Sequence, residues 1–278
     1  MIYTAPMTGT ADYDPAPAEL LSCRLCPRLA AYREAVARAK RRAYAEQEYW
    51  GRPVPGFGDL GARLLIVGLA PGAHGSNRTG RMFTGDAAGN FLHAALHRAG
   101  LANRPASVSR DDGLALRGAF ITAAVRCVPP GNRPAPGEIA NCRRWLARDL
   151  SLPRLRVLLA LGRIGHEALL DLWVAAGVPL VKARLPFAHG AEHALPPLPE
   201  WRPGMARSPG EPRRPWVPPP ARTTGVRAAG VILIDSYHVS FQNTNTGKLT
   251  AAMFDAVVAR AKALARSGQD ARPGAPRR

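Results

Sequence analysis

RLLIVGLAPGAHGSNRTGRMFTGD, residues 63–86, contains a buried strand, a glycine-rich loop and the start of a helix. Its first part, Arg63–Leu69, is a continuous apolar run, which is typical of a strand covered on both faces of a parallel sheet. Asp86 ends the loop in the position of an N-cap, and the helix is expected to run to Ala99. The stretch therefore predicts a strand, a specialised loop and a helix, in that order.

The same strand-then-helix order recurs three times further along the chain. Strands are expected at 119–125, 156–161 and 231–237, and helices at 138–150, 163–176 and 250–264. This alternation predicts an α/β fold, a three-layer α/β/α sandwich around a central, mostly parallel four-stranded sheet. Ligands bind such sheets beyond the carboxyl ends of the strands, so the loops found there are the expected active site.

The remaining segments suggest one domain with irregular additions. Residues 18–265 are expected to form a single domain that begins with a helical segment at 19–47, broken near Pro27. Residues 1–17 and the basic tail 266–278 are predicted to be disordered. A Pro- and Arg-rich insertion is expected at about 195–230, because its composition fits neither strand nor helix.

The charge balance indicates a polyanionic partner. The chain has 38 Lys and Arg against 20 Asp and Glu, a formal net charge of +18. Such an excess favours binding to DNA, whose phosphates dominate affinity of this kind. No apolar run approaches the ~20 residues of a membrane span, and the N-terminus lacks the features of a secretory signal. We therefore expect a monomer in the cytoplasm, associated with the nucleoid through DNA and not with a membrane.

Four cysteines need an explanation other than disulfides, which are uncommon in the cytosol. Cys23 and Cys26 form a CxxC pair, and Cys127 and Cys142 lie much later in the chain. An iron–sulfur cluster, a zinc ion and unligated core cysteines are all compatible with this set. The wide spacing of the second pair is unlike a zinc ribbon and favours the cluster. Its role would be structural, tying the N-terminal helices to the sheet and placing nearby arginines against a phosphate backbone: Arg24, Arg28, Arg33, Arg38, Arg41 and Arg42.

Two loops carry side chains suited to ligand binding. The first matches neither a P-loop nor a dinucleotide fingerprint, but its glycines allow close approach of the backbone. Its candidate pocket residues are Ala70, Gly72, His74, Gly75, Asn77, Arg78 and Phe83, followed by Asp86. The second loop follows the last strand and offers His238, Ser240, Phe241, Gln242 and Asn243. Plain structural roles remain open for Asp86 as a helix cap and for Phe83 as a core aromatic.

Four segments of this chain resemble the family 5 uracil-DNA glycosylases, a branch of the uracil-DNA glycosylase superfamily. They are GLAPGAHGSNRTGRMFTGD, ITAAVRCVPPGNRP, YHVSFQNTNTGKLT, and CRLCPRL together with the two later cysteines. The resemblance covers most of residues 20–265 except the insertion. It implies a DNA repair enzyme that flips out uracil and hydrolyses its bond to deoxyribose, leaving an abasic site without cutting the strand.

The resemblance also assigns roles to individual residues. It implies that Asp86 and Asn132 act in catalysis, that His238 hydrogen-bonds the base and that Phe83 stacks on it. Ala70 stands where most members of the superfamily carry a polar catalytic residue. Phe241 or Gln242 are the candidates for a wedge that fills the gap in the stack, with Asn243 beside them at the DNA backbone.

Two further implications concern specificity and the cofactor. Ala123 stands where related branches carry an asparagine that reads pyrimidines, so the resemblance implies a broader range of deaminated bases, such as hypoxanthine and xanthine. The four cysteines match the ligands of a 4Fe–4S iron–sulfur cluster in the family. Two other function classes remain as alternatives: a non-catalytic, metal-containing nucleic-acid-binding module, and an α/β enzyme that acts on free nucleosides.

Overall fold

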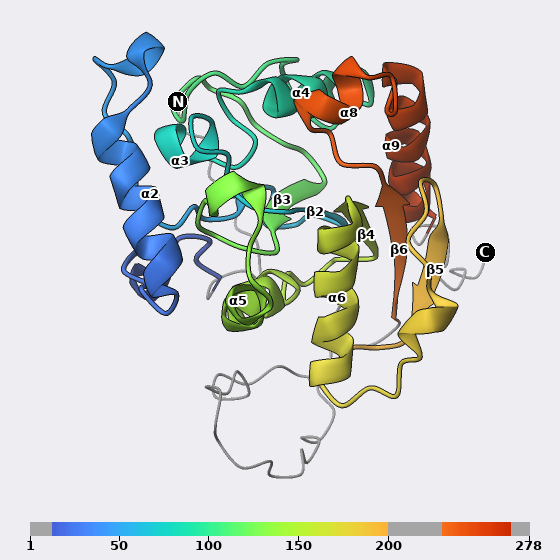
Figure 1. Cartoon of the computed structure of the whole chain (residues 1–278). Helices are drawn as coiled ribbons and strands as arrows, with labels where there is room; N and C mark the ends of the chain where they lie inside the picture. Colours follow the sequence, from blue (N-terminus) through green and yellow to red (C-terminus); the bar gives the residue numbers. More distant parts are fainter. Residues whose placement is uncertain (1–12, 200–229, 268–278) are drawn as a thin grey trace, which may run out of the picture.

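A single mixed sheet lies between two helical layers in the computed structural model, which describes residues 13–199 and 230–267 (Figure 1). Its strand order is β1-β3-β2-β4-β6-β5. The four central strands are parallel: β2 (Leu64–Gly68), β3 (Ala119–Ala123), β4 (Val157–Leu161) and β6 (Val231–Ser236). The predicted three-layer architecture and the four predicted strands are confirmed.

The sheet is wider than predicted, because it has six strands in the described part of the chain and not four. Strand β1 (Phe57–Gly58) pairs antiparallel with β3, and β5 (Glu192–Leu195) pairs antiparallel with β6. β1 is too short to show a periodic pattern in a Gly- and Pro-rich segment. β5 begins a segment that looks irregular in composition, and only its pairing with β6 makes it a strand.

The helices form the two outer layers. One face is covered by α4 (Ala87–Arg98) and α9 (Ala251–Arg266), and the other by α5 (Pro136–Asp149) and α6 (Arg163–Ala175). Along β2, Leu64 and Ile66 belong to the first core, whereas Leu65 and Val67 belong to the second. Because both faces are buried, the strand is apolar at every position.

The N-terminal helices are shorter than the predicted helical segment. They are α1 (Ala18–Leu21) and α2 (Pro27–Ala39), and they lie beside the sheet (Figure 1). Helix α2 ends before Lys40, which adopts a left-handed φ of 51°. A 3₁₀ turn, η1 (Arg42–Tyr44), follows. Two further 3₁₀ turns are η2 (Pro130–Asn132) and η3 (Lys182–Arg184), and two short helices, α3 (Ser76–Thr79) and α8 (Phe241–Asn245), stand near the carboxyl ends of the strands.

The predicted irregular segments fall partly outside the described residues. Tyr13 lies within the segment predicted to be disordered, but its hydroxyl donates to Asp149 Oδ1 at 2.6 Å. Leu195 and Leu198 lie at the start of the predicted insertion and are both buried. The structure differs from the prediction there, because these apolar side chains complete a core. Residues 1–12, 200–229 and 268–278 lie outside the description.

Over residues 13–199 and 230–267, no helix combines the length and the apolar character that crossing a membrane requires.

Candidate active site

A cleft of about 690 Å³ opens at the carboxyl ends of the parallel strands. It is formed by the loops after β2, β3 and β6, so it brings Asp86, Asn132 and His238 into one site although they are far apart in the sequence. Its lining residues include most of the predicted ones: Ala70, Gly72, Phe83, Asp86, Asn132, His238, Ser240, Phe241, Gln242 and Asn243.

The two carboxylate oxygens of Asp86 have different surroundings. Its Oδ1 accepts the backbone N–H of Gly89 at 2.8 Å, which makes Asp86 the N-cap of α4, as predicted. Its other oxygen, Oδ2, lies over two glycines of the loop. A Cβ added at Gly75 would stand 1.9 Å from Oδ2, and one added at Gly72 would stand 3.0 Å away. Burial raises the pKa of Asp86 above its ordinary value, and the Gly89 hydrogen bond opposes that shift.

Phe83 is held in an unusual backbone conformation. Its φ is 49°, in the left-handed region that a bulky residue rarely adopts. The ring packs against the end of β2, where a Cβ at Gly68 would lie 2.7 Å from the ring carbon Cζ. The ring centroid is 6.4 Å from that of His238, and the two planes are inclined by 36°. Phe83 therefore forms one wall of the cleft, and Gly68 makes room for it.

His238 lies directly after β6 and faces Phe83 across the cleft. Its carbonyl oxygen accepts the Asn243 side-chain N–H at 2.8 Å, so Asn243 holds the loop in place. Gly162, after β4, leaves space for the histidine, because a Cβ there would be 3.0 Å from His238 Cβ. Burial lowers the pKa of His238 to about 4. The ring is therefore neutral near pH 7 and keeps one N–H for donation.

Asn132 stands at the rim of the cleft, in the 3₁₀ turn that follows β3. It is exposed and has a left-handed φ of 56°. Within the described residues, no hydrogen bond is formed by its side chain. Its neighbour Arg133 also lines the cleft, and the sequence interpretation missed it. The signal was a basic residue directly after the Pro-Pro-Gly-Asn turn.

Five predicted pocket residues do not line the cleft: His74, Gly75, Asn77, Arg78 and Ala123. Three of them instead support the loop. Arg78 donates to the carbonyl oxygens of His74 and Gly85, at 2.7 and 2.9 Å. Asn77 is fully buried and donates to Arg33 O at 3.2 Å. His74 Nδ1 lies 3.0 Å from the hydroxyl oxygen of Tyr49. Ser76 and Met82, which were not predicted, line the cleft.

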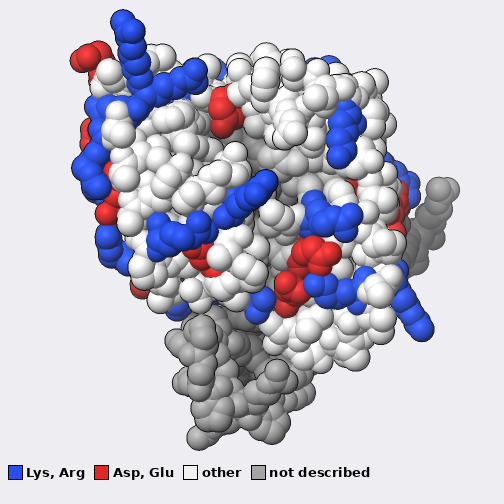
Figure 2. Space-filling model, viewed as in Figure 1, with Lys and Arg blue, Asp and Glu red and all other residues white. Residues whose placement is uncertain are grey.

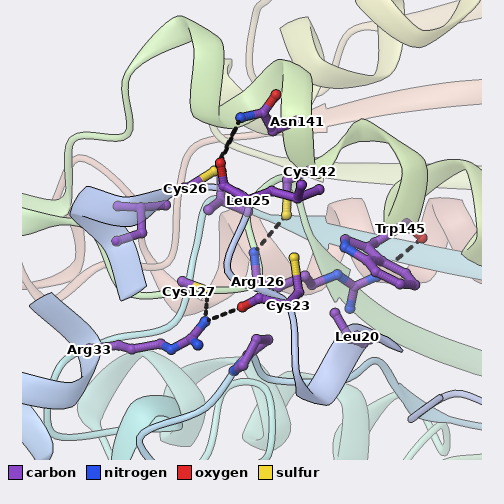
Figure 3. Close-up of a pocket in the computed structure, with 13 residues that line it drawn as sticks. Leu20, Cys23, Leu25, Cys26, Arg33, Arg126, Cys127, Asn141, Cys142 and Trp145 are labelled. Carbon is purple, nitrogen blue, oxygen red and sulfur yellow. Dashed lines mark hydrogen bonds between the residues drawn. The ribbon is translucent and has the colours of Figure 1, made fainter. Parts of the chain in front are cut away.

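The four cysteines meet in a second, small pocket (Figure 3). Cys23 and Cys26 come from the α1–α2 turn, Cys127 follows β3, and Cys142 belongs to α5. Three sulfurs accept N–H hydrogen bonds: Cys127 Sγ from Arg33 Nη1 at 2.9 Å, Cys142 Sγ from the Arg126 backbone at 3.2 Å, and Cys26 Sγ from the Asn141 side chain at 3.5 Å. The four cysteines that the prediction groups together therefore line one pocket, between the N-terminal helices, the loop after β3 and α5.

Four cysteine thiolates can bind either a zinc ion or an iron–sulfur cluster, because both accept four sulfur ligands. The donor set in this pocket therefore fits the predicted cluster and keeps zinc as the alternative.

The basic residues near the cysteines differ in their availability. Arg33 is 3% exposed and is committed to the cysteine pocket, so it does not reach a phosphate backbone as predicted. Arg24 and Arg28 pair with Glu34 and Glu138. Both arginines are exposed despite these ion pairs, as are Arg38, Arg41 and Arg42. On the face in view in Figure 2, Lys and Arg side chains outnumber acidic ones.

Comparisons with known proteins relate this chain to enzymes that act on DNA. The family model for the uracil DNA glycosylase superfamily matches residues 55–262. A type-5 uracil-DNA glycosylase of Thermus thermophilus is 49% identical over 247 residues, which cover 88% of this chain and 95% of that protein. One from Mycobacterium tuberculosis is 46% identical and covers 87% and 78%, respectively. One from Pyrobaculum aerophilum is 42% identical and covers 90% and 92%.

Proposed function

The chain belongs to the uracil-DNA glycosylase superfamily, and from this premise we propose that it excises uracil from DNA by hydrolysing the bond between base and deoxyribose. The observation that carries the proposal is the meeting of Asp86, Asn132, His238 and Phe83 around one cleft. A purely nucleic-acid-binding module has no need for a half-buried carboxylate, a neutral histidine and an aromatic wall in one cavity.

Binding begins with the DNA backbone and the flipped nucleotide. The target atom is hidden inside a duplex, so the nucleotide has to leave the stack. Phe241 is 65% exposed at the start of α8, on the rim of the cleft, which suits a wedge that occupies the vacated space. Arg133 lines the same cleft, is exposed and suits contact with a phosphate. The extruded base would then stack on Phe83.

Bond cleavage leaves negative charge on the departing base and an electron-poor sugar. A neutral His238 N–H stabilises the base anion in the way an oxyanion hole stabilises a developing alkoxide. Asp86 Oδ2 is the free oxygen of the capping carboxylate, so it orients or deprotonates the attacking water while Oδ1 stays bound to Gly89. Asn132 assists at the rim with its amide. Lysine is absent from the residues that line the cleft, which supports direct hydrolysis and a monofunctional enzyme.

A small side chain in the cleft supports a broad choice of bases. Ala70 lines the cleft and offers no hydrogen-bonding side-chain group that a wrong base would leave unpaired, whereas Ala123 lies outside the lining. We therefore propose that hypoxanthine and xanthine are excised as well as uracil. The proposed substrate is double-stranded DNA, and the enzyme is proposed to act as a monomer at the nucleoid.

The cofactor proposed for the four cysteines is a 4Fe–4S cluster, held by Cys23, Cys26, Cys127 and Cys142 with a structural role. Iron and sulfide analysis of the purified protein, with zinc measured in parallel, tests it. About four irons per chain support the cluster. Zinc at about one ion per chain, bound through sulfur, would instead support the alternative that the cysteines left open.

The test of the function uses defined oligonucleotides. Uracil-containing duplex, uracil-containing single strand and free deoxyuridine are incubated with the protein, and abasic sites are then cleaved with alkali. Strand breaks that appear only after alkali support a monofunctional glycosylase. Release of uracil from free deoxyuridine alone would favour the nucleoside enzyme, and tight binding of DNA without any release would favour the binding module. Duplexes with hypoxanthine or xanthine then rank the bases.

A further inference from the structure

Three buried side chains that bind metals well meet at the β5 edge of the sheet, apart from both the cleft and the cysteine pocket. His166 belongs to α6, His193 to β5 and Asp235 to β6. One ligand atom of each lies within 4.8 Å of the other two. His166 and Asp235 are fully buried, and His193 is 9% exposed. The roles proposed above for catalysis and for the cluster leave all three unused.

The hydrogen bonds of His166 show that a proton or an ion lies between its ring and the carboxyl group of Asp235. Its Nε2 lies 3.0 Å from the carbonyl oxygen of Leu185, which can only accept, so Nε2 carries a hydrogen. In a neutral ring, Nδ1 then has only a lone pair. Yet Nδ1 lies 2.8 Å from Asp235 Oδ1, which also has only lone pairs. Either a proton, on the ring or on the carboxyl group, or a metal ion has to lie between these atoms.

The second carboxylate oxygen of Asp235, Oδ2, and its neighbour His193 favour a metal ion over a proton. Asp235 Oδ2 and His193 Nε2 lie 3.4 Å apart, and both are buried without a hydrogen-bond partner among the described residues. A proton on His166 would satisfy only one carboxylate oxygen and would leave these two atoms unsatisfied. Buried polar atoms of this kind call for a bound ion or water. One ion near the carboxylate accounts for all of them.

We propose that His166, His193 and Asp235 form a zinc site. Two imidazole nitrogens and one carboxylate oxygen are typical zinc ligands, whereas Mg²⁺ and Ca²⁺ prefer oxygen alone. The ion would join α6, β5 and β6, which are well separated from one another in the sequence. Since Asp235 lies on β6, three residues before His238, the site would also anchor the segment that carries the proposed base-binding histidine.

Zinc binding to the full-length protein, with its iron content monitored, tests the proposal. The protein is dialysed against a chelator, equilibrated with zinc and examined by zinc X-ray absorption. We expect about one zinc per chain with nitrogen and oxygen neighbours at about 2.0–2.2 Å and the scattering pattern of imidazole. Neighbours at about 2.3 Å, the length of a Zn–S bond, would place the ion at the cysteines and overturn the proposal.

Two variants distinguish zinc binding at this site from nonspecific zinc binding elsewhere on the protein. His193→Gln removes one ligand at the least buried position, and we expect zinc affinity to fall by at least about tenfold, the loss common even for outer partners of a metal. His97→Gln, at an exposed histidine on α4, is the matched control and should bind as the wild type does. Equal affinity in His193→Gln and the wild type would overturn the proposal, as would a wild type that takes up no zinc. The X-ray absorption arm needs no variant, so it decides even if His193→Gln folds poorly.

Discussion

Asp86 shows how one side chain can serve both the fold and the chemistry. One carboxylate oxygen caps α4, and the other faces the cleft above two glycines. Asparagine caps a helix about as well as aspartate does, but it cannot accept a proton from water. The two roles can therefore be separated by a substitution that changes a single atom.

Asp86→Asn is predicted to lower uracil excision by about 10²–10⁴-fold, the usual contribution of a positioned base, while the melting temperature stays close to that of the wild type. Single-turnover kinetics on a uracil-containing duplex and thermal unfolding measure the two effects. Asp255→Asn is the control, because that carboxylate forms an exposed ion pair with Arg98 and such pairs add little stability. Wild-type rates in Asp86→Asn would contradict the assigned role.

Backbone conformation marks two other residues of the cleft. Phe83 and Asn132 both have left-handed φ values, 49° and 56°, and each such residue costs on the order of 1–3 kcal/mol. Asparagine tolerates this region, whereas phenylalanine rarely does. The surrounding loop therefore has to hold Phe83 in place, through the close fit of its ring to Gly68. Strain of this kind is typical of functional sites, and it agrees with the proposed role of Phe83 as a platform for the base.

At the scale of elements, the loop between β2 and α4 lacks side chains where its backbone lies close to Asp86. Gly72 and Gly75 bring the backbone under the Asp86 carboxylate, and Gly80 and Gly85 supply the positive φ angles with which the loop turns. A methyl group at Gly75 would overlap Asp86 Oδ2 at 1.9 Å, a distance that no relaxation of the side chain can absorb without moving the carboxylate. Arg78 fixes the loop through its bonds to His74 O and Gly85 O.

Gly75→Ala is predicted to reduce excision by about a hundredfold, because a shift of about 1 Å in a catalytic group has that effect. Gly137→Ala, in α5, is the matched control. A Cβ there meets nothing within 4 Å, and alanine favours the helix, so activity should be unchanged and stability equal or slightly higher. The measurement is again the single-turnover rate. Full activity in Gly75→Ala would show that the loop tolerates displacement of Asp86.

Helix α8 presents Phe241 to solvent at the rim of the cleft. A large apolar side chain that is 65% exposed contributes little to the core. Insertion into a base stack is the role proposed for it here. Ser240 caps this short helix and Asn243 ties it to His238 O, so the wedge and the base-binding histidine are held by the same loop.

Phe241→Ala is predicted to weaken productive binding of uracil-containing duplex by about 10–100-fold, since stacking on a base is worth about 1–3 kcal/mol. The melting temperature should not change. Val108→Ala is the control, because Val108 is similarly exposed, at 61%, but does not line the cleft. Fluorescence of a base analogue opposite the lesion reports flipping directly. Unchanged flipping in Phe241→Ala would exclude it as the wedge.

For the whole molecule, buried neutral histidines make stability depend on pH. Burial lowers the pKa of His93 and of His238 to about 4, against 6.5 for an ordinary histidine. Above pH 6.5, both are neutral in the folded and the unfolded chain. Between 6.5 and 4, the unfolded chain binds protons that the folded chain does not, so stability falls as the pH is lowered. Each histidine contributes about 3 kcal/mol to this loss at most.

The melting temperature is therefore predicted to fall steeply from pH 6.5 to pH 4, and His93→Gln should make that fall shallower. His97→Gln, an exposed position on the same helix, should keep the wild-type slope. The slope with pH is the quantity to compare, because His93→Gln also lowers stability at every pH. Equal slopes in the two variants would show that His93 is not the group responsible.

The chain order of apolar runs and turn residues was enough to predict the layers of this fold. The central strands are mostly apolar because both faces of the sheet are covered, and this pattern can be recognised within a single segment such as Leu64–Gly68. The caps of helices are local too, which is why Asp86 was predicted to begin α4. The edge strands β1 and β5 were missed, because a strand of two residues, or one rich in polar side chains, exists only through pairing with its neighbour.

The candidate site also has a part that could be predicted from the sequence and a part that only the fold determines. Residue types and order were sufficient to select Asp86, His238 and the four cysteines as candidates, whereas Asn132 was selected only through the resemblance to the family. Which residues reach the cleft depended on packing over long sequence distances. Arg78 and Asn77 look like ligand-binding residues, but their polar groups are used to hold the loop. The meeting of His166, His193 and Asp235 has no signature in the sequence, because its members come from three elements that only the folded sheet brings within 4.8 Å.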